Sequence, residues 1–130
     1  MSYELTITQK PAYLHAIVTG RNTKENVAAY LDEIRRECIA RGCTRVLIEE
    51  HLVGPRIGTM DVFTIASGAS ARARGFFEAV AYVDANAESD QNMKFAETVA
   101  VNRGLRGRMF RSVADAEKWL RKPDRGNSRG

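Results

Sequence analysis

The chain has 130 residues, of which 44% are hydrophobic and 28% are charged, and its formal net charge is +4 at pH 7. This length and composition fit one globular domain that buries roughly two thirds of its unfolded surface without disulfides or metal. No apolar run approaches the ~20 residues of a membrane-spanning helix, and the first residues do not resemble a signal peptide. Two cysteines, Cys38 and Cys43, are too few for a disulfide scaffold. We therefore expect a cytoplasmic protein whose cysteines are reduced.

The positive charge is concentrated toward the end of the chain. Residues 101–130 contain nine Lys and Arg residues against three Asp and Glu residues, so residues 1–100 carry a formal charge of −2. Basic segments attract phosphate-bearing partners, but this one lacks the repeated aromatic residues of a base-stacking platform. We expect a solvated helix face and a disordered basic tail over 123–130, with 1–122 as the single domain. Nucleic acid is not an expected partner.

The first third of the chain predicts a hairpin followed by a helix. Residues 3–9 alternate polar and apolar side chains, Lys10 and Pro11 form a turn, and residues 12–19 return as a second strand. Asn22 and Glu25 have the spacing of a capping box, which predicts a helix that begins there. Gly42 should end this helix. Its inner side should carry the apolar residues at helical spacing, Val27, Leu31, Ile34 and Cys38.

The rest of the chain alternates between strands and helices. Strands that are separated by helices should lie parallel through crossover connections, so we predict an α/β fold of order β-β-α-β-α-β-α-β-α with a mixed, mostly parallel sheet. The predicted strands cover residues 44–49, 76–83 and 108–111. The first of the intervening helices begins at Gly58 or Thr59 and is ended by the small residues 67–75, and the second is capped by Ser89 or Asp90 and ends near Gly104. A last helix is capped by Ser112 and is held against the protein by Ala116, Trp119 and Leu120.

This order of elements resembles the STAS fold of the anti-sigma-factor antagonists, and more closely its SpoIIAA-like branch of largely uncharacterised small bacterial proteins. The segments that carry the resemblance are Arg45-Val-Leu-Ile-Glu49, Phe77-Glu-Ala-Val-Ala-Tyr-Val-Asp84 and Met109-Phe-Arg-Ser-Val-Ala-Asp-Ala-Glu-Lys-Trp-Leu120. The match covers about Tyr3 to Leu120. It implies a SpoIIAA-like fold and a non-enzymatic regulatory or protein-interaction role.

A candidate phosphoacceptor or anion site lies at the start of the second helix. STAS switch proteins carry a phosphorylatable serine there in an Asp-Ser-Ser-Gly-like motif, and the matching segment here is Ile57-Gly-Thr-Met-Asp61. Thr59 replaces the acceptor serine, while the aspartate and glycine of the motif are missing from their places. A phosphate on Thr59 would lie among free N–H groups beside Gly58, and Arg56 could pair with it or with an anionic ligand. A plain capping role for Thr59, worth about 1 kcal/mol, explains the same residue.

The apolar second helix suggests an interaction surface. Met60 and Phe63 precede the small-residue run Ala66-Ser-Gly-Ala-Ser-Ala71, which allows close approach of a partner, a second copy or an apolar ligand, or simply close packing on the sheet. We take a protein partner or a homodimer as the main hypothesis. A carrier or sensor of a small apolar or anionic ligand near residues 53–61 is the alternative, and it predicts an enclosed cavity above ~300 Å³.

Signals for catalysis are weak. Glu49, Glu50 and His51 are consecutive, and a carboxylate beside a histidine can act as an acid–base pair. Because side chains alternate along a strand, Glu49 and His51 could share a side, whereas Glu50 and His51 should not converge. A polar strand end in solvent explains the same residues. His15 is expected on an exposed face without a second metal ligand. We therefore expect no catalytic residue, metal or cofactor. An enzyme that uses Glu49 and His51 is the third hypothesis, after a protein-interaction module and a ligand carrier.

Overall fold

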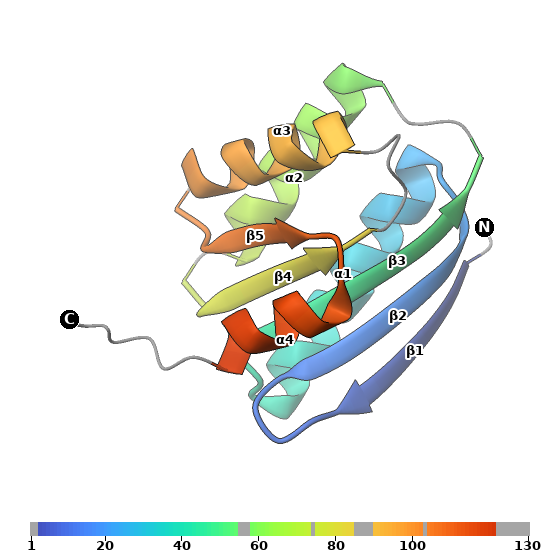
Figure 1. Cartoon of the computed structure of the whole chain (residues 1–130). Helices are drawn as coiled ribbons and strands as arrows, with labels where there is room; N and C mark the ends of the chain where they lie inside the picture. The colour runs from blue at the N-terminus through green and yellow to red at the C-terminus, as the bar shows by residue number, and fades with distance from the viewer. Residues whose placement is uncertain (1–2, 55–57, 74, 85–89, 103, 122–130) are drawn as a thin grey trace.

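The structure is a computed structural model that describes residues 3–54, 58–73, 75–84, 90–102 and 104–121. These residues form a five-stranded sheet with helices on both faces, as Figure 1 shows. In chain order the elements are β1 (Tyr3–Gln9), β2 (Leu14–Arg21), α1 (Lys24–Arg41), β3 (Arg45–Val53), α2 (Thr59–Ala73), β4 (Ala79–Val83), α3 (Asp90–Asn102), β5 (Gly107–Phe110) and α4 (Val113–Arg121). This order confirms the predicted α/β fold class. The expected tail, 123–130, lies outside the described residues.

The strands of the sheet follow the order β1-β2-β3-β4-β5, so neighbours in the sheet are also neighbours in the sequence. β1 and β2 form the predicted antiparallel hairpin, and β2, β3, β4 and β5 pair in parallel. A helix joins each parallel pair, because parallel strands need a long crossover connection. The mixed, mostly parallel sheet is therefore confirmed.

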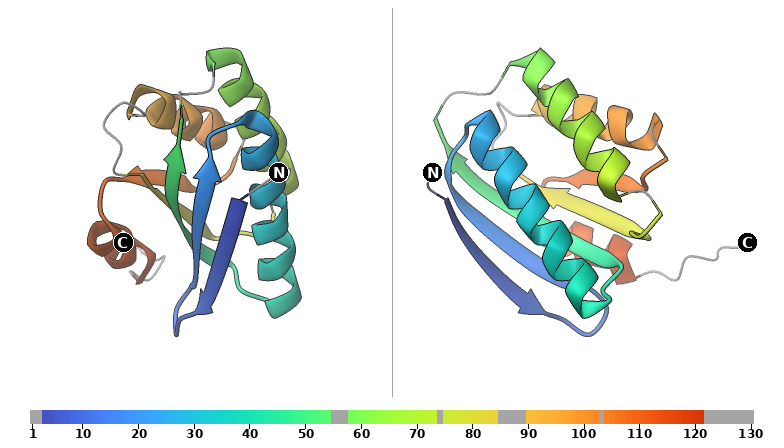
Figure 2. Two further views of the ribbon diagram at one scale, coloured as in Figure 1. Left: turned by 90° about the vertical axis from the view of Figure 1, so that its right-hand side faces the viewer. Right: turned by 180° about the vertical axis from the view of Figure 1, so that it is seen from behind.

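Helices α1, α2 and α3 cover one face of the sheet, and α4 covers part of the other face (Figures 1 and 2). The larger core, beneath α1 and α2, contains the buried residues Leu14, Ala16, Val18, Val27, Tyr30, Ile34, Cys38, Val46, Ile48, Ala73, Val80 and Leu105. The smaller core, beneath α4, contains Tyr13, Leu47, Ala79, Ala81, Val83, Ala116 and Leu120. Among the described residues, no helix is both long and apolar enough to cross a membrane.

The boundaries of α1 follow from its capping residues. Thr23, rather than the predicted Asn22, is the N-cap, and its side-chain oxygen accepts a hydrogen bond from the N–H of Asn26 at 3.1 Å. Asn22 instead donates its backbone N–H to the carbonyl of Val53 at 2.8 Å, which ties it to the end of β3. Gly42 ends the helix as predicted. Its φ of 65° is left-handed, a conformation that glycine adopts at little cost.

Strand β3 is longer than predicted, because it continues past Glu49 to Val53. β2 reaches Arg21, and the parallel register pairs Arg21 with Val53, so the sheet supports the extra residues. The segment from Glu49 to His51 is therefore regular strand, in which alternate side chains point to opposite faces. The other strand predictions differ less: β4 begins at Ala79 rather than Phe76, and β5 is displaced by one residue.

Helix α2 ends at Ala73, within the segment 67–75 that is predicted to end it, but it continues through most of the small residues of that segment. Alanine has the highest helix propensity, so a run of alanine and serine stays helical when one side packs against the protein. Ser70 and Ala73 form part of that buried side. At α4 the prediction holds: Ser112 accepts a hydrogen bond from the N–H of Asp115 at 3.2 Å, and Ala116 and Leu120 are buried.

Candidate functional site

Two groups of polar side chains lie on opposite faces of β3. Glu50 points toward α1, α2 and α3, on the same face as Ile48 and Leu52. Glu49 and His51 point to the other face, where α4 packs against Leu47. The alternation along one strand thus separates two adjacent carboxylates, and each belongs to a different candidate site.

The first site is a cavity between the three helices and the face of the sheet formed by strands β3, β4 and β5. Its volume is about 120 Å³, and it is partly open to solvent. Asn22 follows β2, Glu50 lies near the end of β3 and Asp84 follows β4, so one edge of the sheet supplies all three. The cavity is lined by Asn22, Val27, Tyr30, Leu31, Glu50, Leu52, Val62, Ile65, Ala66, Ala69, Ser70, Tyr82, Asp84, Ala96, Glu97, Leu105, Gly107, Arg108 and Met109.

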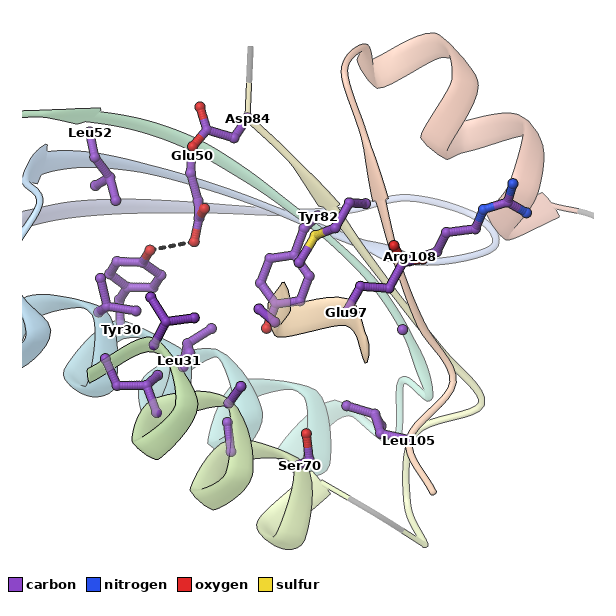
Figure 3. A pocket seen from close by; sticks show the side chains of 18 of the residues that line it. Tyr30, Leu31, Glu50, Leu52, Ser70, Tyr82, Asp84, Glu97, Leu105 and Arg108 are labelled. Carbon is purple, nitrogen blue, oxygen red and sulfur yellow. Dashed lines mark hydrogen bonds between the residues drawn. The ribbon is translucent and has the colours of Figure 1, made fainter. Parts of the chain in front are cut away.

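The Glu50 carboxyl is the main polar feature of this cavity. Glu50 is only 8% exposed, and its Oε2 accepts a hydrogen bond from the hydroxyl of Tyr30, as Figure 3 shows. Burial raises the pKa of Glu50 from its ordinary value of 4.5 to about 7; the bond from Tyr30 acts to lower it, and the charge of Asp84 acts to raise it. A buried carboxyl that titrates near neutrality is common at functional sites.

Two tyrosines stand beside this carboxyl. The Tyr30 side chain is fully buried, and burial together with the nearby Glu50 raises its pKa well above 10. Tyr82 is half-buried, and Figure 3 shows its ring pointing into the cavity below Glu50. Burial, and then the charge of Glu50, raise the pKa of Tyr82 as well. Both hydroxyls therefore stay protonated near neutral pH.

The small residues of α2 form the opposite wall. Ala66, Ala69 and Ser70 line the cavity, so the run that suggested a groove in the sequence faces it. The cavity is smaller than the ~300 Å³ expected of a pocket for a drug-sized molecule, and it is not enclosed. An engineered cavity of about 150 Å³ holds a benzene molecule. This cavity therefore suits a compact molecule only.

The second site is a bridge between two histidines on the other face. Glu49 Oε1 lies 2.8 Å from His15 Nε2, and Glu49 Oε2 lies 2.7 Å from His51 Nε2. The expectation that Glu49 and His51 share a side is therefore correct. The expectation that His15 is exposed is wrong, because its side chain is only 12% exposed and meets Glu49. The parallel register of β2 and β3 sets Ile17 beside Glu49, and this brings His15 within reach.

The environment of Glu49 favours its charged form. Burial acts to raise the pKa of Glu49, but the hydrogen bonds from His51 and His15 outweigh it, and the pKa is lowered. Glu49, His15 and His51 line neither the cavity described above nor a smaller hollow beside Arg35 and Phe77. Within the described part of the chain, no three His, Cys, Asp or Glu side chains are arranged to hold a metal ion. The bridge thus has an acid–base pair but lies outside both hollows.

The predicted phosphoacceptor site is described only in part. Thr59 is the first residue of α2, and Arg56 lies outside the described residues. The carbonyl of Gly58 accepts a hydrogen bond from the N–H of Val62 at 3.0 Å, so Gly58 rather than Thr59 occupies the capping position. Phosphorylation or anion binding at Thr59 therefore stays a prediction.

The predicted interaction surface lies at the exposed start of α2. Met60 is 73% exposed and Phe63 is 37% exposed, while Val53, at the end of β3, is 61% exposed. Met60 and Phe63 are three positions apart on α2 and therefore share one side of the helix. Single exposed apolar residues are ordinary, whereas apolar patches mark interaction sites.

Tyr30, Tyr82 and Asp84 were not predicted from the sequence to be site residues. One signal was available for Glu50: with Val46, Ile48 and Leu52 it occupies the alternate positions of β3 that should face the core. A charged side chain on a buried strand face needs a partner or a function. The partner, Tyr30, lies three residues after Val27 and four before Ile34, on the inner side of α1.

Comparison with known proteins supports the fold. The structure of this chain is similar to that of an uncharacterised protein of the DUF3478 family with a SpoIIAA-like fold, from Shewanella loihica PV-4. The superposition covers 91% of this chain and 93% of the other, with 16% sequence identity and a TM-score of 0.53. No family model and no curated protein matches the chain. At this identity the likeness concerns the backbone arrangement. The chain therefore has a SpoIIAA-like fold.

Proposed function

We propose that this protein is a non-enzymatic regulatory module that responds to a compact, mainly apolar small molecule bound in the cavity at Glu50. The observation that carries the proposal is the cavity itself. It lies between the sheet and helices α1, α2 and α3, has mostly apolar walls and contains one buried carboxyl. Pockets for small molecules commonly combine apolar walls with a few convergent polar groups. This proposal differs from the ligand alternative based on the sequence, which expected an enclosed cavity above ~300 Å³ near residues 53–61, because the cavity proposed here is smaller, partly open and lined by α2.

The energetic cost of this arrangement supports a functional role. Protein interiors are normally close-packed, and burial of a carboxyl without full compensation destabilises the fold. The Tyr30 hydroxyl is the hydrogen-bond donor to Glu50 among the described residues. A leucine at position 50 beside Ile48 and Leu52 would have continued the apolar face of β3. Departures from packing rules of this kind occur most often at functional sites.

The cavity also offers a route from ligand to partner. Its wall includes Val62, Ala66 and Ala69 of α2, and the same helix carries Met60 and Phe63 on its exposed start. A ligand that fits one position of α2 better than another shifts the helix toward that position. A partner that contacts Met60 and Phe63 would then sense occupancy of the cavity, which is a coupling between two sites.

The exposed apolar start of α2 favours a second candidate function, a protein-interaction module that needs no ligand. Met60, Phe63 and Val53 are the observation behind it. The partner would be another protein or a second copy of the chain. In both versions the module is cytoplasmic, uses no cofactor and binds neither membrane nor nucleic acid.

An NMR titration with benzyl alcohol and benzylamine tests the ligand proposal. Both probes should cause saturable shifts in the amide signals of cavity residues such as Glu50 and Ala69. Ala69→Leu fills the cavity from α2 and should abolish these shifts. Ala71→Leu makes the same change on the exposed side of that helix and should leave them unchanged. Shifts that survive Ala69→Leu, or no saturable shift with either probe, would contradict the proposal.

A further inference from the structure

We propose that the cavity selects a compact organic cation, an ammonium group on a small apolar body, and that the charged end lies against Glu50. This inference rests on the proposed function, because it names the class of ligand for the same cavity. It depends on three features of the site, namely the sign of the charges in its wall, the aromatic rings beside Glu50 and the size of the space.

The charged residues of the wall are mostly acidic. Glu50, Asp84 and Glu97 line the cavity, and the one cationic residue among its described lining is Arg108. Arg108 is exposed, and Figure 3 shows its side chain leading away from Glu50. Its guanidinium carbon lies 5.6 Å from the ring centroid of Phe110, which packs with the α4 core on the other face. The positive charge of Arg108 is therefore turned away from the carboxyl.

A bound ammonium would compensate the buried carboxyl. The Tyr30 hydroxyl bonds to one oxygen of Glu50, and this neutral donor leaves the negative charge of the ionised form in place. An ion pair is stronger in a low-dielectric interior than in water, and it repays the cost of desolvation when hydrogen bonds satisfy both groups. A bound anion would instead add a charge beside Glu50 and Asp84. The cavity wall therefore discriminates by the sign of the ligand's charge.

The aromatic rings favour the same class of ligand. Tyr30 and Tyr82 both line the cavity, one from α1 and one from β4. The face of a tyrosine ring attracts a cation, and this attraction grows when the pair is desolvated. Both hydroxyls stay protonated because burial raises the pKa of each. Both rings therefore remain neutral, and of the two the half-buried Tyr82 is the one with surface open to an alkylammonium group.

The size of the cavity limits the ligand to one small group. The volume of about 120 Å³ is below that of the benzene-binding cavity of about 150 Å³, although this one is partly open to solvent. Leu31, Leu52, Val62 and Ile65 provide apolar contact for the body of the ligand. A single ring or a short branched chain that carries an amine fits this description, and benzylamine is a suitable probe.

Binding of a cation should depend on pH through Glu50. The groups that line the cavity around this carboxyl are Tyr30 of α1, Tyr82 of β4, Asp84, Glu97 of α3 and Arg108 of β5. With a pKa of about 7 in the free protein, Glu50 is mostly protonated at pH 6 and mostly ionised at pH 8. Only the ionised fraction forms the ion pair, so the affinity for a cation should rise about tenfold over this range.

Calorimetric titrations with benzylamine, benzyl alcohol and benzoate at pH 6 and pH 8 test the inference. In the wild type, benzylamine should bind most tightly, benzoate most weakly, and only benzylamine should gain about tenfold in affinity at pH 8. Glu50→Gln should bind benzyl alcohol as before, which shows an intact cavity, but lose the preference for benzylamine and its pH dependence. Glu37→Gln removes the same charge from the outer part of α1 and should retain both.

The outcomes separate this inference from the proposed function. If benzyl alcohol or benzoate binds the wild type at pH 8 as tightly as benzylamine does, the cation preference is wrong, and the cavity remains a site for small molecules. The same holds if Glu50→Gln keeps the preference. If none of the three probes binds, both the inference and the proposed function fail. If Glu50→Gln does not fold, the affinities of the wild type for the three probes at pH 6 and pH 8 decide whether the cavity prefers a cation.

Discussion

The hydroxyl of Tyr30 on α1 donates a hydrogen bond to the Glu50 carboxyl on β3, and both side chains lie in the interior of the protein. The bond joins the first helix to the middle of the sheet at the floor of the cavity. It therefore connects the stability of the fold with the ionisation of the residue that we propose as the ligand anchor.

Removal of that hydroxyl should destabilise the protein more at high pH than at low pH. A hydrogen bond to a charged group contributes about 1.5–3 kcal/mol, and one to a neutral group contributes about half as much. Tyr30→Phe should therefore lower the free energy of unfolding by ~2 kcal/mol at pH 8, where Glu50 is ionised, and by less at pH 5. Urea unfolding at the two pH values measures this. Tyr3→Phe is the matched control: its hydroxyl bonds to Glu33 near the surface, at 2.6 Å, and its loss should cost under ~1 kcal/mol.

The raised pKa of Glu50 predicts a loss of stability as the pH rises. Below pH 4 the carboxyl is protonated in both states. Above its ordinary pKa of 4.5 the unfolded chain releases the proton, whereas the folded protein keeps it until about pH 7, so the unfolded state is favoured increasingly over this window. The wild type should lose up to about 3 kcal/mol relative to Glu50→Gln between pH 4 and pH 8. Parallel pH profiles of the two proteins would rule out a raised pKa.

Glu49 should show the opposite dependence. Its pKa is lowered in the folded protein, so it contributes stability above its ordinary pKa, and this contribution is lost as the pH falls through the folded value. Glu49→Gln should therefore lower the free energy of unfolding at pH 7 by about 1 kcal/mol, and the difference should shrink in acid. The same unfolding series measures it. Opposite pH dependences of stability for Glu49→Gln and Glu50→Gln would show that the two carboxylates lie in different environments.

The second candidate function predicts self-association or partner contact through α2. If copies of the chain pair through this surface, the double substitution Met60→Ser and Phe63→Ser should weaken self-association at least tenfold, measured by sedimentation equilibrium. Ile39→Ser, at an exposed apolar residue of α1, is the control and should leave association unchanged. A wild type that stays monomeric throughout, or a double variant that associates normally, would exclude a homodimer at this surface.

Most of the fold follows from local patterns in the sequence. The alternation in β1, the helical spacing from Val27 to Cys38, and the glycine after α1 each depend on a few neighbouring residues. Two elements run further than their local patterns indicate, because each gains support from another part of the fold. β3 continues to Val53 because β2 pairs with it, and α2 continues through its small residues because Ser70 and Ala73 pack inward.

The candidate sites depend on contacts between distant segments, and for this reason the sequence revealed them only in part. The alternation rule places Glu49 with His51 on one face, but the contact with His15 requires the register between β2 and β3. Likewise, Glu50 stands out as a charge on a buried face, while Tyr30 and Tyr82 come from two other elements. Spacing along one strand cannot identify partners on another element.

The central claim, a small molecule held at Glu50, is tested most directly by native mass spectrometry of the protein purified from its own host. Our account predicts a small-molecule adduct on the wild type that dissociates on activation and is absent from Ala69→Leu, in which the cavity is filled. A wild-type spectrum with the bare mass alone, or the same adduct on Ala69→Leu, would contradict the account.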